Sequence, residues 1–83
     1  MSAEHITSLV QVQPVPDELA QAAWSQWSVN GHDVLAALRL VAERHFDHEI
    51  RHLARVAAIE ACTYPLVYAA FESVCWQRER EAR

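Results

Sequence analysis

The chain has 83 residues, of which 52% are hydrophobic, a size and composition that fit one small folded domain and argue against intrinsic disorder. Its net charge is −4, it has no lysine, and residues 1–38 have no arginine, so this half lacks the cations that a nucleic-acid surface needs. No apolar run reaches the ~18 residues of a transmembrane helix, and we expect no signal peptide before the segment with Cys62 and Cys75. We therefore expect a cytoplasmic protein that binds no membrane and whose cysteines are reduced core thiols.

The first segment, residues 1–15, is predicted to be an extended arm or a single strand. Val10–Gln13 alternates apolar and polar residues, as a half-buried strand does, and Pro14 and Pro16 end this pattern. No second strand is evident in the sequence, so we do not expect a sheet within one chain.

Three helices are predicted after the arm, over residues 16–29, 33–62 and 65–81. The first begins at Pro16, followed by acidic residues that suit the positive end of a helix, and Asn30-Gly31 stops it. Asp33 caps the long central helix, and Pro65 interrupts the chain by a turn or a kink. The predicted fold class is all-α: residues 1–83 form a single domain of three helices with a long central helix.

The central helix carries two stripes at helical spacing. The first is apolar, includes Leu38, Phe46 and Ile50, and is predicted to face the core. The second has heptad spacing and consists of Val34, Leu38, Val41, His45, His48, His52, Arg55 and Ile59. It is interpreted either as the flank of a wide buried face or as a contact with another chain. Because histidine changes charge near physiological pH, such a contact would depend on pH.

The first helix carries Trp24 and Trp27, three residues apart, so both rings cannot point fully into a small core. One partly exposed ring would suit a protein–protein hot spot. The alternative is a buried ring whose N–H reaches the edge of the core. The predicted partner-binding residues are Val34, Val41, His45, His48, His52, Ile59, Trp24 and Trp27.

A His-Glu-x-x-His motif occurs at residues 48–52 of the central helix. Histidines four residues apart share one helix face and can bind one zinc ion, and the glutamate can deprotonate a zinc-bound water. Over these five residues the chain resembles zinc metallopeptidases of the zincin type. The resemblance implies a zinc cofactor bound by His48, His52 and Glu72, with Glu49 as the general base. Without it, we expect no cofactor.

Residues 8–50 resemble ribbon-helix-helix repressors in the order and length of their elements, a short strand followed by two helices. The resemblance implies a DNA-binding dimer that places its strands in the major groove. Gln11 and Gln13 of the candidate strand are residues of a type that can read adenine. A repressor or an antitoxin is therefore the second alternative.

The sequence as a whole favours a non-enzymatic protein–protein interaction module. We expect a regulator or inhibitor of a larger partner, such as a phage-encoded inhibitor of bacterial host defence, acting as a homodimer or inside a complex. The acidic first half fits a basic patch on the partner, such as one that otherwise binds nucleic acid. This expectation rests on size and charge.

Overall fold

The computed structural model describes residues 15–83, which form four helices and, within this range, no strand. The helices are α2 (Asp17–Val29), α3 (Val34–Arg44), α4 (His48–Thr63) and α5 (Pro65–Glu81). The all-α class predicted from the sequence is therefore confirmed. Residues 1–14, which contain nearly all of the predicted arm or strand, lie outside the described residues.

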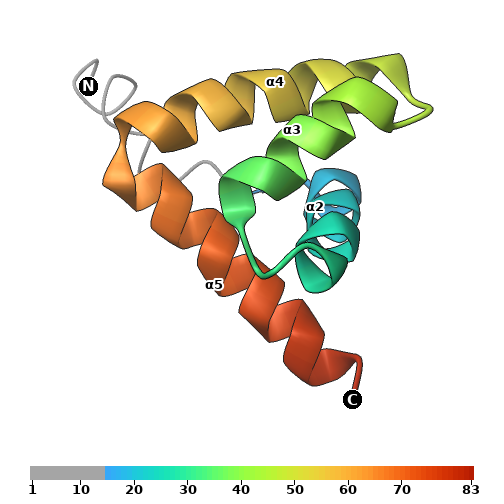
Figure 1. Ribbon diagram of the computed structural model, residues 1–83, viewed down its shortest axis with the longest axis vertical. Coiled ribbons are helices and arrows are strands. Elements are labelled where there is room, and N and C mark those ends of the chain that lie inside the picture. The colour runs from blue at the N-terminus through green and yellow to red at the C-terminus, as the bar shows by residue number, and fades with distance from the viewer. Residues whose placement is uncertain (1–14) are drawn as a thin grey trace, which may run out of the picture.

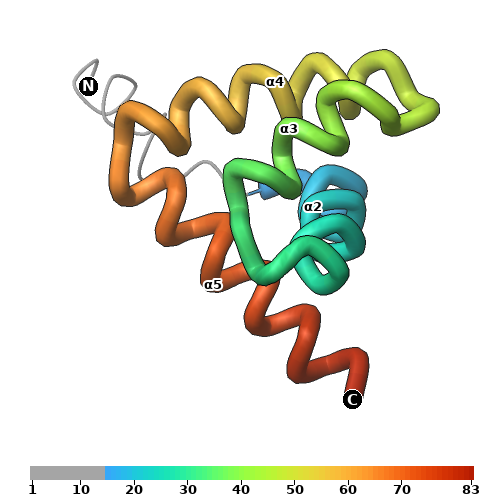
Figure 2. Tube along the Cα trace, viewed as in Figure 1, coloured from blue at the N-terminus to red at the C-terminus, as the bar shows by residue number. Residues whose placement is uncertain are grey.

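The four helices pack around a shared core. α3 and α4 fold back on each other, and α4 meets α5 at a corner (Figure 1). α2 packs against both α3 and α5, and Figure 2 shows it nearly end-on. The largest fully buried side chains are those of Trp27, Val34, Leu38 and Cys75. Many other core residues are alanines, whose small side chains let the helix backbones approach closely.

The turn between α2 and α3 follows the predicted stop signal. Gly31 has a φ of 76° and His32 a φ of 59°, so two consecutive residues adopt left-handed conformations. The N–H of His32 donates to the carbonyl oxygen of Trp27 at 3.0 Å, which closes the end of α2. Asp33 then caps α3, as predicted, because its side chain accepts a hydrogen bond from the N–H of Ala36.

The prediction of one central helix over 33–62 is wrong, because the chain breaks between Arg44 and His48. His45 has an extended backbone, with φ −64° and ψ 142°. Asp47 caps a new helix, since its carboxylate accepts from the N–H groups of Glu49 and Ile50 at 2.8 and 3.3 Å. The connection is held by the Arg51 guanidinium, which donates to the carbonyl oxygen of His45 at 2.6 Å. α3 and α4 can therefore form a hairpin instead of one rod.

The break also changes the predicted core stripe. Leu38 and Ile50 are buried as predicted, but Phe46 lies in the connection and is 85% exposed. Its ring stacks on His45, with centroids 4.6 Å apart. The prediction that Phe46 belongs to the core is therefore wrong. Helical spacing does not hold across a residue with an extended backbone, so it cannot place residues on both sides of His45 on one face.

Removing the cap of α4 tests this break. Asp47→Ala is expected to lower the free energy of unfolding by about 1 kcal/mol, because two N–H groups lose their side-chain acceptor. Urea denaturation followed by circular dichroism measures the difference. Asp47→Asn is the control, since asparagine caps helices about as well as aspartate. Equal loss of stability in both variants would show that the cap does not define the start of α4.

At Pro65 the chain turns and begins a new helix, and α4 does not continue through a kink. Tyr64 is extended, with φ −117° and ψ 112°, and Pro65 occupies the first turn of α5, where its missing N–H costs nothing. α5 and α2 begin and end within one residue of their predicted ranges.

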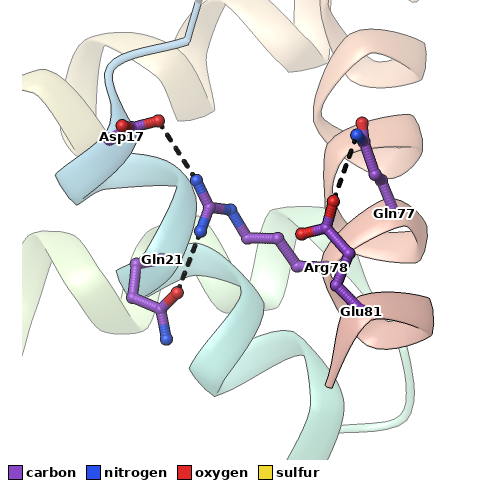
Figure 3. A network of polar contacts seen from close by, with 5 residues as sticks. All are labelled: Asp17, Gln21, Gln77, Arg78 and Glu81. Atoms are coloured by element: carbon purple, nitrogen blue, oxygen red, sulfur yellow. Dashed lines mark hydrogen bonds and ion pairs between the residues drawn. The ribbon is translucent and has the colours of Figure 1, made fainter. Parts of the chain in front are cut away.

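A polar network ties α5 to α2 at the surface (Figure 3). The Arg78 guanidinium donates to Asp17 at 3.2 Å and to Gln21 at 3.0 Å. On α5 itself, the Gln77 amide donates to Glu81 at 3.4 Å. Because Asp17 is fully exposed, the ion pair is screened by solvent and contributes little to stability.

Candidate functional site

The solvent-facing side of α4 combines imidazoles, a cation and apolar side chains. Ile59 is 64% exposed and Val56 is 39% exposed. Their side chains project from the same side of the helix axis, and the buried residues of α4 project from the opposite side. We call this surface the outer α4 face, and it consists of His48, His52, Arg55, Val56 and Ile59, all of them exposed.

The second stripe of the sequence is divided by the break after α3. Its first part, with Val34, Leu38 and Val41, is buried in the core. Val34 and Val41 therefore cannot present their side chains to a partner, and their assignment as partner-binding residues is wrong. Its second part, from His48 to Ile59, points to solvent. Neither sequence interpretation holds for the whole stripe, because one half is core and the other half is surface.

Trp27 is 0% exposed, so its assignment as a partner-binding residue is also wrong. Its indole stacks on the His32 ring at 4.1 Å and meets the edge of Trp76 at 4.9 Å. Its Nε1 has no hydrogen-bond partner among residues 15–83. Trp24 is half-buried, and its Nε1 donates to the Glu79 carboxylate at 3.0 Å, which holds α2 against α5. Of the two rings, only that of Trp24 reaches the surface.

His45 has a structural role that the sequence did not indicate. Its Nδ1 accepts a hydrogen bond from the N–H of Asp47 at 3.0 Å, and its carbonyl oxygen accepts from Arg51. It is half-buried at the turn between α3 and α4 and does not belong to the outer α4 face. Phe46, its exposed neighbour, is a surface residue that the sequence reasoning missed. In the sequence, Asp47 was the residue that could have indicated this turn, because aspartate often caps the start of a helix.

The structure does not assemble the three zinc ligands implied by the zincin resemblance. His48 and His52 lie one turn apart on the outer α4 face, with Glu49 beside them. Glu72 lies on α5, and no three His, Cys, Asp or Glu side chains within residues 15–83 converge so that they could hold a metal ion. The ligand set of His48, His52 and Glu72 is therefore wrong, and what is left of the motif is a surface pair of histidines.

The two cysteines occupy different environments. Cys75 is buried, and this burial raises the pKa of its thiol to about 11, an effect that nearby Arg78 opposes and Glu72 reinforces. The thiol is therefore protonated at neutral pH and unreactive. Cys62 is exposed on α4, so the prediction that it is a core residue is wrong. Both thiols are free.

Comparison with known proteins finds no matching family model, no similar curated protein and no similar solved structure. The strand on which the ribbon-helix-helix resemblance depends lies almost wholly outside the described residues. Within residues 15–83, no helix has the length and apolar character that crossing a membrane requires.

Proposed function

We propose that this chain is a non-enzymatic protein–protein interaction module that binds another protein through the outer α4 face. The observation that supports the proposal is the exposure of Ile59 and Val56 beside His48 and His52 on one helix face. Single exposed apolar residues are ordinary, but neighbouring ones with a polar rim are typical of interaction surfaces.

Ile59 offers the largest gain from burial on the outer α4 face. Full burial of an isoleucine side chain is worth about 1.5–3 kcal/mol. With 64% of Ile59 still in contact with water, covering it recovers roughly 1–2 kcal/mol. Ile59 is fixed on a helix, so its ordering on binding costs little entropy. These properties make it the natural centre of the interface, with the histidines and Arg55 at its rim.

A regulatory or inhibitory role belongs to the same proposal. A domain of this size has room for a binding surface and for little more than the small core that supports it. Phage-encoded inhibitors of bacterial host defence are one class of protein with this size and mode of action. Self-association, as the sequence predicts, is the simplest form of the interaction. However, an α4–α4 contact would bring Arg55 and the imidazoles of two copies together, so a different protein fits this face better.

Site-specific photo-crosslinking in cells of the native host tests the proposal. A benzophenone side chain at position 59 is expected to give one discrete adduct, whose mass separates a pair of 9.5 kDa chains from a complex with another protein. The matched control is position 29, because Val29 is 75% exposed but lies at the end of α2. No adduct at position 59, or the same adduct at position 29, would contradict a specific interface on α4.

A further inference from the structure

A groove runs between α3 and α4, next to the outer α4 face. Arginines line it from both helices: Arg39 from α3, and Arg51 and Arg55 from α4. Its floor is made by Ala42 and Ala58, both buried. Small floor residues allow a partner backbone to approach closely, and the arginines provide donors along both walls.

Within the described part of the chain the groove carries a net positive charge, because Glu43 is the single carboxylate that lines it beside the arginines. The two ion pairs found in residues 15–83 are made by Arg78 of α5 and by Arg83, which follows the end of that helix. Arg51 donates to a neutral carbonyl oxygen, and this contact does not neutralise the guanidinium charge. Arg39 and Arg55 make no ion pair in this range. Arg51 and Arg55 are one turn apart, and like charges at this spacing destabilise a helix. The arrangement therefore costs stability that carboxylates of a partner would restore.

The groove also has apolar lining residues beside its charges. Ile59 lies at its edge with most of its side chain exposed, and it is shared with the outer α4 face. Apolar residues with arginines on both α3 and α4 match a helix that has an apolar stripe flanked by carboxylates. Arginine is well suited to this contact, because its planar donor fork binds carboxylates in a bidentate manner.

We propose that the groove binds an acidic amphipathic helix of the partner protein. Apolar side chains of that helix pack on Ala42, Ala58 and Ile59, and its carboxylates accept hydrogen bonds from Arg39 and Arg55. This inference rests on the proposed function, and it names the chemistry of the partner.

A nucleic acid is a poorer occupant for this groove. Glu43 lines it as well and would repel a continuous row of phosphates. A duplex would also leave the exposed Ile59 uncovered, and the net charge of −4 repels a polyanion at long range. A helix with a few carboxylates can place them opposite the arginines and leave the position opposite Glu43 free.

The test is an NMR titration of the full ¹⁵N-labelled chain with synthetic peptides. The probe is a helical peptide of about 18 residues, with leucine on one face and glutamate on both flanks. It is expected to shift the amide signals of residues 39–43 and 55–59. The same peptide with lysine in place of glutamate, and a DNA duplex of about 20 base pairs, are expected to leave these signals in place.

Charge reversal makes the test specific. Arg39→Glu with Arg55→Glu is expected to weaken binding of the acidic peptide at least about tenfold, because both walls then repel it. The control is Arg80→Glu with Arg83→Glu on the exposed end of the chain, which changes the net charge by the same amount. Equal weakening by the control, shifts outside the groove, no binding of the acidic peptide, or binding of the lysine peptide or the DNA instead would each overturn the inference.

The two proposals fail in distinguishable ways. Crosslinking at position 59 without binding of the acidic peptide in the groove would leave the protein-binding role in place and remove the acidic helix as its partner. Peptide binding in the groove without any crosslink at position 59 in cells would remove the proposed function, and the inference that rests on it would fall with it.

Discussion

Replacing Trp27 with alanine is expected to lower the free energy of unfolding by about 3–5 kcal/mol, a large part of the stability of a domain this small. The indole is fully buried, and it contacts the rings of His32 and Trp76. Alanine would leave a cavity that these rings cannot fill, because His32 is held at a left-handed backbone position. Urea denaturation monitored by far-ultraviolet circular dichroism measures the loss.

Trp27→Phe is the matched variant for this prediction. Phenylalanine keeps an aromatic ring at the centre of the cluster and removes an N–H that has no hydrogen-bond partner among the described residues. Its cost is therefore expected to be much smaller than that of alanine. If Trp27→Ala retained the wild-type midpoint, α2 would not be packed on α5 as described.

The starts of α2 after Pro16 and of α5 at Pro65 were predictable because the signals that set them are local. A proline in a first turn, the left-handed Gly31 and the Asp33 cap act through the backbone of a few neighbouring residues. The break at Asp47 is local too, but the apolar spacing on both sides of it matches one continuous helix. The capping signal was outweighed by that longer pattern, and the prediction of one helix failed there.

The division of residues between core and surface could not be predicted in the same way. Trp24 and Trp27 have similar positions on α2, and only the placement of α5 decides that Trp27 is buried while Trp24 bonds to Glu79. Likewise, a stripe with heptad spacing from Val34 to Ile59 would form one surface on a single continuous helix. Once the chain folds back after α3, Val34 lies inside and Ile59 lies outside. These outcomes depend on tertiary packing, which periodicity does not encode.

Ile59→Glu is expected to weaken partner binding more than about 100-fold, because it places an unpaired charge at the centre of the interface and removes its main apolar contact. The fold should tolerate the change, since most of this side chain is already in water. A thermal melt within a few degrees of wild type would establish that the variant is folded. Val29→Glu adds the same charge to an apolar position on α2 that is even more exposed, and it serves as the control.

Isothermal titration of the purified crosslinking partner with these three proteins is the most direct measurement. If the outer α4 face is the interface, wild type and Val29→Glu bind with dissociation constants that agree within about threefold, and Ile59→Glu binds at least about 100-fold more weakly. Binding of a folded Ile59→Glu variant at wild-type affinity would place the partner elsewhere on the molecule and contradict the proposed function.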